Sequence, residues 1–335
     1  MTSLAIAANG LRKSYPGKDG DKVVLDGIDL AVPEGTIFSL LGPNGAGKTT
    51  TVQILSTLIR ADGGTVQVAG YDLNDQADDV RGAIGVTGQY SAVDKLLTGE
   101  ENLLLMADLR HLSRKEGKRK AAELLERFDL VDAARKTAGT YSGGMQRRLD
   151  LAMTLVGDPR LIFLDEPTTG LDPRSRRAMY GIVRDLVADG VTIFLTTQYL
   201  EEADELADRI ALLDHGRLIA EGTADELKRL IPGGHVSLTF TDDDALKNAL
   251  SALDRGFVDP ADDDRLTLQV PSDGDVASLR ELLARLDTAG VEPTGLSIHT
   301  PDLDDVFLTL TGQSTDENAA QNTTQNSDQN SEALR

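Results

Sequence analysis

Residues 42–49, with the sequence Gly-Pro-Asn-Gly-Ala-Gly-Lys-Thr, constrain the fold of this chain more than any other segment. They match the pattern G-x4-G-K-[ST], whose glycines let successive backbone N–H groups converge on phosphate groups. The apolar run 37–41 predicts a strand that leads into this loop, and Val52, Leu55 and Ile59 supply an apolar stripe for a helix behind it. A strand, a glycine loop and a helix in this order predict a nucleotide-binding site.

Two side chains of this loop carry predicted chemistry of their own. Lys48 is expected to hold the β- and γ-phosphates, and the Thr49 hydroxyl is expected to be a ligand of Mg²⁺. The alternative is a glycine-rich turn that matches the pattern by chance, and the flanking strand and helix argue against it. The predicted ATP contacts in and after the loop are Gly42, Pro43, Asn44, Gly45, Ala46, Gly47, Lys48, Thr49 and Thr50.

An acidic pair follows a second apolar run, 161–164. A buried strand there would deliver Asp165 to the metal side of the nucleotide, where it can hold Mg²⁺ through water. Glu166, the next residue, can accept a proton from the attacking water. The alternative is an acidic pair that only ends a strand before Pro167. Together with the phosphate loop, this pair predicts an ATPase that uses Mg²⁺.

A second anion-binding helix start is predicted at 141–146, Tyr-Ser-Gly-Gly-Met-Gln. Ser142 is a good N-cap, and two glycines clear space at the positive end of the helix. Because this segment lies in a helical insert far along the chain from the phosphate loop, we expect it not to reach the same chain's nucleotide. Two chains arranged head-to-tail solve this, since each would cap the other's γ-phosphate with Ser142, Gly143, Gly144 and Gln146. The alternative is an ordinary Ser-capped helix.

The fold class follows from apolar runs that alternate with helical stretches. Three of these runs are continuous, which suits strands buried on both faces of a parallel sheet: 37–41, 161–164 and 191–195. Helices are predicted in an insert at about 90–157, where 98–101 and 113–116 both have the sequence of a capping box. These features predict an α/β P-loop core with a helical subdomain.

Three segments are predicted along the chain. Residues 1–230 form the nucleotide-binding domain, and in 234–312 alternating strand patterns and a leucine stripe predict a small α+β domain of ferredoxin-like type. Residues 313–335 have almost no large apolar side chain, so they cannot offset their ordering entropy and are predicted to be disordered. The aspartate triplets 242–244 and 262–264 are interpreted as solvated turn charge rather than a Ca²⁺ site, because no Gly/Glu pattern of a calcium loop follows them.

Composition excludes several function classes. The chain has 335 residues, with 34 Lys and Arg against 55 Asp and Glu, and its net charge of −21 argues against a broad nucleic-acid groove. It has no cysteine, which excludes disulfides, thiol nucleophiles and Cys-ligated zinc. No segment has the ~18 uninterrupted apolar residues of a membrane-spanning helix, and the start lacks the pattern of a signal peptide. We therefore expect a cytosolic chain that reaches a membrane only through a partner.

In the order and spacing of these motifs the chain resembles the ATP-binding subunit of ABC transporters, over roughly residues 5–230. The resemblance implies that Tyr15 stacks on adenine and that Gln89 touches Mg²⁺ and the lytic water. It also implies that Asp172, in Gly-Leu-Asp, couples the sites of two subunits. The alternatives are a half-buried surface tyrosine and a polar turn glutamine.

Two motifs of that family are altered in this chain. Its LSGGQ signature matches 141–146 with Tyr141 in place of leucine and one further substitution, at Met145. The family usually has a histidine after Thr-Thr, where it contacts the γ-phosphate, and this chain has Gln198. An amide can donate a hydrogen bond to phosphate but cannot carry a proton or a positive charge. The resemblance thus implies a catalytic role for Gln198 through hydrogen bonding.

The segment 196–204, Thr-Thr-Gln-Tyr-Leu-Glu-Glu-Ala-Asp, and the appended C-terminal domain look like the daunorubicin/doxorubicin-resistance branch of the family. That branch implies an ATPase subunit that powers efflux of a hydrophobic drug, antibiotic or lipid through a separate membrane subunit of the ABC-2 type. It implies a homodimer at the cytoplasmic face of the membrane, with no nucleic-acid partner. The segment 90–97 is expected to expose apolar residues, Val93 and Leu97 among them, in a groove that receives a helix of the membrane subunit.

The alternative function is a soluble ABC ATPase without a membrane partner, similar to a translation factor. Such proteins normally carry two cassettes in one chain and basic elements for RNA, whereas this chain has one phosphate loop and an excess of acidic residues. The chemistry of the ATP site does not distinguish export from import, and only the branch resemblance indicates export.

Overall fold

The computed structural model describes residues 3–17, 20–88, 92–231, 234–253, 257–258, 266–272 and 276–311. Gln89 and the predicted tail 313–335 lie outside the described residues. The chain divides into two compact units, Met1–Ala224 and Asp225–Arg335, and each has a hydrophobic core of its own. The division falls a few residues before the boundary predicted at residue 230, and the exact limits of the predicted domains stay a prediction.

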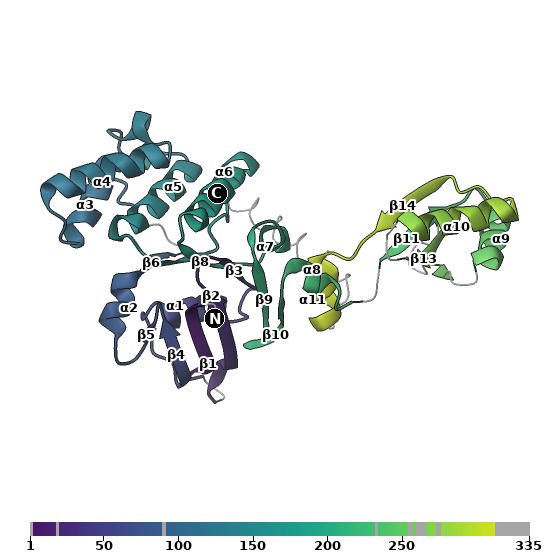
Figure 1. The fold of residues 1–335 in the computed structure, drawn as a ribbon, viewed down its shortest axis with the longest axis horizontal. Helices are drawn as coiled ribbons and strands as arrows, with labels where there is room; N and C mark the ends of the chain where they lie inside the picture. Colours follow the sequence, from purple (N-terminus) through teal and green to yellow (C-terminus); the bar gives the residue numbers. More distant parts are fainter. Residues whose placement is uncertain are drawn as a thin grey trace, which may run out of the picture. The chain divides into compact units, whose positions relative to one another are not determined.

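The first unit is organised around a six-stranded sheet with the order β10-β9-β3-β8-β7-β6 (Figure 1). Its strands are β3 (Ile37–Leu41), β6 (Ile84–Thr87), β7 (Leu161–Asp165), β8 (Thr192–Thr197), β9 (Arg209–Asp214) and β10 (Arg217–Gly222). Neighbouring strands are parallel from β9 to β6, and β10 forms an antiparallel hairpin with β9. The predicted α/β class with a parallel sheet is confirmed.

The central strands are continuous in apolar residues because both faces of the sheet are covered. On β7, Leu161 and Phe163 belong to one hydrophobic cluster, whereas Ile162 and Leu164 belong to another. Side chains alternate between the faces of a strand, so a strand between two cores has no polar face. The acidic residues are therefore confined to the end of β7, where Asp165 is the last residue of the strand and Glu166 follows it.

One face of this sheet is covered by a second, antiparallel sheet that the sequence patterns did not predict (Figure 1). Its order is β2-β1-β4-β5, and its strands are β1 (Leu4–Tyr15), β2 (Lys22–Pro33), β4 (Gly63–Val68) and β5 (Tyr71–Asp72). The helices of this layer are α1 (Lys48–Leu55) and α2 (Ala77–Ala83). Ile59, predicted to extend the stripe of α1, lies beyond the end of that helix and is partly buried in the same core.

Helices cover the other face (Figure 1). They are α3 (Gly99–Leu109), α4 (Arg114–Arg127), α5 (Gly143–Thr154), α6 (Pro173–Ala188) and α7 (Leu200–Leu206), with 3₁₀ turns at Val131–Ala133, Ala138–Thr140 and Leu155–Gly157. Both predicted capping boxes are present. The hydroxyl groups of Thr98 and Ser113 accept the N–H groups of Glu101 and Glu116, whose carboxylates accept the cap N–H groups in return. These caps fix where α3 and α4 begin.

The second unit contains a four-stranded antiparallel sheet with the order β12-β13-β11-β14. Its elements are α8 (Ala224–Lys228, at the division), β11 (His235–Thr239), α9 (Asp243–Leu253), β12 (Phe257–Val258), β13 (Thr267–Pro271), α10 (Val276–Ala289), β14 (Gly295–His299) and α11 (Leu303–Thr311). From β11 to β14 the chain runs strand-helix-strand-strand-helix-strand, which is the predicted ferredoxin-like arrangement.

Residues 242–244 are exposed to solvent, as interpreted, but two of the three aspartates belong to the start of a helix and not to a turn. Asp243 and Asp244 form the first turn of α9, and the Asp242 carboxylate accepts the Ala245 N–H at 2.8 Å. Acidic side chains are favourable at this position because they face the positive end of the helix. The triplet 262–264 lies outside the described residues. Among the helices of the described part of the chain, none is long and apolar enough to cross a membrane.

Candidate nucleotide-binding site

The predicted motifs meet where three neighbouring strands of the central sheet end. Leu41, the last residue of β3, is in register with Thr197, and Asp165, the last residue of β7, is in register with Thr196. The phosphate loop, Glu166 and Gln198 are the residues that follow these three ends. Ligands of open α/β sheets bind at the carboxyl ends of the strands, which is the edge where these segments lie.

The glycines of the phosphate loop are required by close approach and by backbone conformation. A Cβ atom at Gly42 would lie 2.1 Å from the carbonyl oxygen of Leu213. Gly47 has φ +115° and is the N-cap of α1, and a Cβ there would lie 2.6 Å from a methyl group of Leu25. Gly45 has φ +83° with open space around it. The loop is thus fixed at both ends, leaves room above its middle, and leads directly into the N-terminus of α1, which favours phosphate groups.

Lys48 lies in the loop with its amine held by the loop itself. Its Nζ donates to the carbonyl oxygens of Gly42 at 2.7 Å and Pro43 at 3.1 Å, and lies 3.8 Å from Oε1 of Glu166. Burial lowers the pKa of Lys48, and the carboxylates of Glu166 and Asp165 oppose that shift. The buried amine is therefore held by two carbonyl oxygens of the loop and lies beside the carboxylate of Glu166.

The acidic pair ends β7 in two different environments. Asp165 is 4% exposed, and its Oδ1 accepts the hydroxyl of Thr196. Glu166 turns back toward the loop with φ +48°, and its N–H donates to the carbonyl oxygen of Thr196 at 3.1 Å. Its carboxylate lies between Lys48 and the Thr169 hydroxyl, at 3.8 and 3.4 Å. This places a carboxylate beside the cation expected to hold the phosphates, where a water that attacks a bound phosphate would come within its reach.

The oxygen donors at this edge fit Mg²⁺ bound together with a nucleotide. Thr49 is half-buried in the first turn of α1, and Asp165 is buried at the end of β7. Within the described ranges no group of three or more His, Asp or Glu side chains gathers to form a complete metal cage. Mg²⁺ is commonly held by one or two protein oxygens together with phosphates and water, which is the arrangement that these donors allow.

Tyr15 and Gln198 lie at the borders of this site. Tyr15 ends β1, is 38% exposed, and pairs with Lys22 at the start of β2, the strand whose Leu25 touches the phosphate loop. Gln198 directly follows β8 and is half-buried. An exposed aromatic ring on the strand pair beside the loop is compatible with stacking on a base.

The signature segment forms the helix start that its sequence predicts. The hydroxyl of Ser142 accepts the N–H of Met145 at 3.3 Å, and a Cβ at Gly143 would meet open space. Gly144 differs, because a Cβ there would lie 2.5 Å from the hydroxyl of Ser175 at the start of α6. The amide of Gln146 donates to backbone carbonyl oxygens of its own loop, at Ala138 and Tyr141.

Asp172 has a clear structural role within its own chain. It is the N-cap of α6, and its carboxylate accepts the N–H groups of Arg174 and Ser175 and the hydroxyl of Ser175. The Ser175 hydroxyl and these backbone N–H groups lower the pKa of Asp172. Because Ser175 also touches Gly144, the predicted coupling residue and the signature are adjacent within one chain.

Sequence reasoning missed two charged residues near the site, the buried Glu202 and the largely covered Arg147. Glu202, on α7, is 1% exposed and accepts the hydroxyl of Thr168, and its burial raises its pKa. Arg147 lies on α5 and bonds to the ends of segments far away in sequence. For Glu202 the available signal was a charge one helical turn from the apolar Leu206, but the partners of neither residue could be read from spacing.

The structure corrects the prediction for the segment 90–97. Val93 is buried at 8% exposure, so the prediction that it is exposed in a docking groove is wrong, whereas its neighbour Leu96 is 86% exposed.

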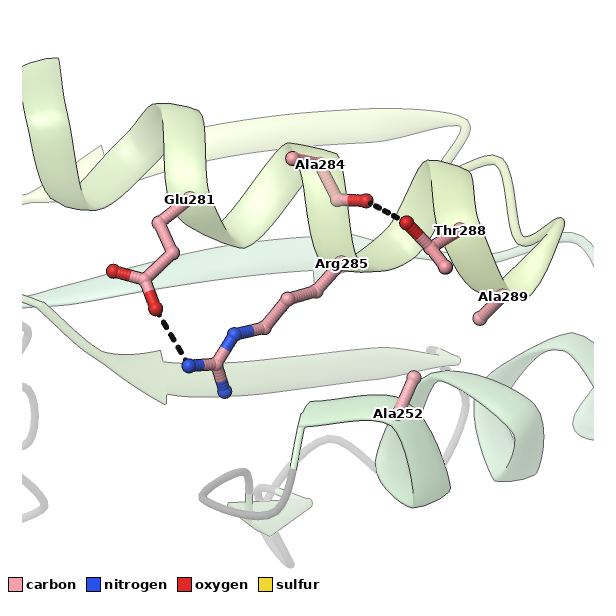
Figure 2. Close-up of a pocket in the computed structure, with 6 residues that line it drawn as sticks. All are labelled: Ala252, Glu281, Ala284, Arg285, Thr288 and Ala289. Carbon is pink, nitrogen blue, oxygen red and sulfur yellow. Dashed lines mark hydrogen bonds and ion pairs between the residues drawn. The ribbon is translucent and has the colours of Figure 1, made fainter.

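In the second unit a cavity of about 440 Å³ lies beside α10 and Ala252 of α9 (Figure 2). Its two charged residues, Glu281 and Arg285, pair with each other at 2.6 Å, so neither is directed at a ligand.

Comparison with known proteins agrees with these motifs. The profile of the family described as "ABC transporter" matches residues 25–169. The chain is 49% identical to the daunorubicin resistance ATP-binding protein DrrA3 of Streptomyces coeruleorubidus, over 93% of this chain and 97% of that protein. It is 47% identical to the daunorubicin/doxorubicin resistance ATP-binding protein DrrA of Streptomyces peucetius, over 94% of each. A solved dimeric ATP-binding cassette in a post-hydrolysis state, bound to ADP and phosphate, is similar with a TM-score of 0.60 and 27% identity. That similarity covers 65% of this chain and 98% of the other.

Proposed function

Because this chain belongs to the ATP-binding subunits of ABC transporters, in their daunorubicin/doxorubicin-resistance branch, we propose that it hydrolyses ATP to drive export of a hydrophobic drug, antibiotic or lipid through a separate membrane subunit. The observation that carries the proposal is the meeting of Lys48 and Glu166 at the carboxyl edge of the sheet, 3.8 Å apart. This pair supplies both a cation for the phosphates and a proton acceptor for water.

In the proposed mechanism each residue at this edge has one task. Lys48 exchanges its bonds to the loop carbonyls for the β- and γ-phosphates, and the N-terminus of α1 stabilises their charge. Glu166 accepts the proton of the attacking water, and Gln198 donates a hydrogen bond to the γ-phosphate. Thr49 and Gln89 would hold Mg²⁺ directly and Asp165 would hold it through water, and the ion would neutralise charge that develops on the phosphates.

We infer that two copies of the chain form the complete site. A solved relative is a dimer, and the signature segment here opens outward at Gly143. In a head-to-tail dimer, Ser142, Gly143, Gly144 and Gln146 would cap the partner's γ-phosphate, and Asp172 would couple the two sites.

A mixing experiment tests this arrangement. Lys48→Ala chains and Gly143→Asp chains should each be inactive, and mixing them should restore part of the activity, because one of the two sites in the mixed dimer is intact. If analytical ultracentrifugation shows the chain to be strictly monomeric under conditions in which it hydrolyses ATP at its full rate, the head-to-tail dimer is contradicted.

The export function is tested in a drug-sensitive host. The chain is co-expressed with a candidate membrane subunit, taken from the neighbouring gene if that gene encodes a membrane protein, and survival in daunorubicin and uptake of the fluorescent drug are measured. Resistance that Lys48→Ala removes supports the proposal. A neighbouring gene without a membrane protein, together with ribosome binding by the chain, would favour the soluble alternative instead.

The segment after Gln89 is proposed to contact the membrane subunit through Leu96, because this leucine is 86% exposed. Its neighbours Lys95 and Leu97 accept backbone N–H groups from residues 138–139, just before the signature segment. Leu96→Asp should abolish drug transport and spare hydrolysis by the isolated chain. Leu58→Asp, at a similarly exposed leucine after α1, is the matched control. Normal transport by Leu96→Asp would refute this contact.

A further inference from the structure

Arg147, one residue after the signature segment, has its guanidinium group directed into the catalytic edge. Nε donates to the carbonyl oxygen of Pro167 at 2.9 Å, and Nη2 donates to that of Asp165 at 3.2 Å. Nη1 donates to the carbonyl oxygen of Gly88 at 2.9 Å. The side chain is 11% exposed. A planar fork with five donors can span three carbonyl groups in this way, whereas an ammonium group cannot.

The two carbonyl groups at Asp165 and Pro167 lie on either side of Glu166. Glu166 has φ +48° and precedes a proline, and both features make this conformation unfavourable for a residue with a side chain. Such a residue persists only where its surroundings fix it. The peptide unit that joins Asp165 to Glu166 is held at both ends, since its C=O accepts from Arg147 and its N–H donates to Thr196.

Asp150, one turn further along α5, orients the arginine. Its carboxylate is 4% exposed, lies 3.4 Å from Nη1 of Arg147, and accepts the N–H of Ala92 at 3.1 Å. Burial raises the pKa of Asp150, and Arg147 supplies the charge that offsets it. The pair thus binds Gly88 and Ala92 as well as the end of β7, all from the helix that carries the signature.

We propose that Arg147 is a positioning residue for hydrolysis: oriented by Asp150, it fixes the backbone on both sides of Glu166 and so places the Glu166 carboxylate beside the phosphate loop. This inference rests on the proposed role of Glu166 as proton acceptor. Through these hydrogen bonds the start of α5 and the backbone around Glu166 move together, so that a shift of α5 displaces the Glu166 carboxylate directly.

The test measures ATP binding and hydrolysis separately in the full-length chain. Arg147→Lys keeps a positive charge beside Asp150 but cannot span the carbonyl groups. It should slow single-turnover hydrolysis by roughly 10²-fold, the scale expected from a small displacement of a reacting group, with unchanged affinity for a fluorescent ATP analogue. Arg148→Ala is the matched control, because the next arginine on the same helix bonds to Phe128 and Asp129 instead. Normal hydrolysis by Arg147→Lys would overturn the proposal.

Two further variants separate positioning from simple stabilisation. The charges are exchanged by combining Arg147→Asp and Asp150→Arg in one chain. Compared with either single variant, the double variant should regain thermal stability but not ATP hydrolysis, because position 147 then has no donor for the carbonyl groups. Recovery of hydrolysis by the exchange would show that only the ion pair matters. In a Glu166→Gln background, Arg147→Lys should cause no further loss, because residues that act as a unit are non-additive. An equal loss in both backgrounds would overturn the proposal.

The Glu166→Gln chain also distinguishes this inference from the function on which it rests. If Glu166→Gln hydrolyses ATP normally, the proposed proton acceptor is wrong. If Glu166→Gln is inactive while Arg147→Lys is fully active, the catalytic assignment stands and only the positioning role fails.

Discussion

Strand β7 of the first unit and strand β11 of the second have five residues each, but they are buried in different ways. All five residues of β7 are buried, whereas β11 buries only Val236 and Leu238 and leaves alternate residues partly exposed. A strand covered on both faces has only its ends free for polar chemistry, and β7 ends in Asp165 and Glu166. A strand covered on one face offers its other face along its whole length. The comparison therefore predicts that catalysis in this chain is confined to strand ends and depends little on strand surfaces.

The largest effect is expected from the end of β7. Glu166→Gln should lower ATP hydrolysis by about 10²–10⁴-fold, the usual contribution of a general base, and leave ATP binding intact. Lys48→Ala, at the other side of the same edge, should instead weaken binding of the triphosphate. Steady-state hydrolysis and equilibrium binding measure the two effects. Rapid ATP turnover by Glu166→Gln would contradict the prediction that catalysis depends on the end of β7.

The second unit should respond in stability rather than in chemistry. Leu238→Ala removes a fully buried side chain of β11 and should cost about 2–5 kcal/mol of the unfolding free energy of that unit. Ser237→Ala, on the opposite face of the same strand, should stay within about 0.5 kcal/mol. Urea unfolding followed by circular dichroism measures both, with ATP affinity as the second readout. A large loss of ATP affinity in Leu238→Ala would show that the two cores are not independent.

The end of β8 provides a sharper version of the same comparison. If Gln198 donates a hydrogen bond to the γ-phosphate, Gln198→Ala should lose roughly 10²-fold in hydrolysis, as when one donor to a developing negative charge is removed. Gln198→His should keep substantial activity and acquire a pH dependence near pH 6–7, because only histidine titrates there. Hydrolysis across pH 5.5–8.5 separates the three chains. Equal turnover by all of them would show that the position is vestigial.

The smallest effect concerns the helix caps at the starts of α3 and α4. Hydrogen bonds from the Thr98 and Ser113 backbone and side chains lower the pKa of Glu101 and of Glu116. A carboxylate with a lowered folded-state pKa stabilises the protein above its unfolded pKa and loses this contribution as pH falls through the lowered value. Thr98→Ala should cost about 1 kcal/mol at pH 7. The stability lost in Glu101→Gln should shrink below about pH 4, and a constant loss from pH 7 to pH 3 would contradict this.

The parts of the molecule that sequence predicted are those whose causes are local. The phosphate loop, the buried runs of β3, β7 and β8, and the capping box at Thr98 each depend on residues within a few positions of one another. The ferredoxin-like order of the second unit also follows from its alternating strands and leucine-rich helix. In such segments the pattern and the physical cause coincide.

The parts that sequence did not predict depend on contacts between distant segments. The antiparallel sheet of β1, β2, β4 and β5 is set by pairing registers that no periodicity specifies, and Val93 is buried by neighbours outside its own segment. Arg147 was missed because the carbonyl groups that it contacts belong to residues such as Gly88 and Pro167. A backbone carbonyl group is present at every residue, so its role leaves no trace in the residue types.

The left-handed backbone at Glu166 has a consequence for how this protein responds to selection. Glycine and asparagine adopt that conformation more readily than glutamate, so replacing Glu166 by either should raise the stability of the fold while removing its proton acceptor. A screen for thermal stability alone would therefore enrich inactive chains at this position, as expected where activity depends on a strained residue. In laboratory evolution of this chain, retention of glutamate at position 166 would indicate that ATP turnover, rather than the fold, is under selection.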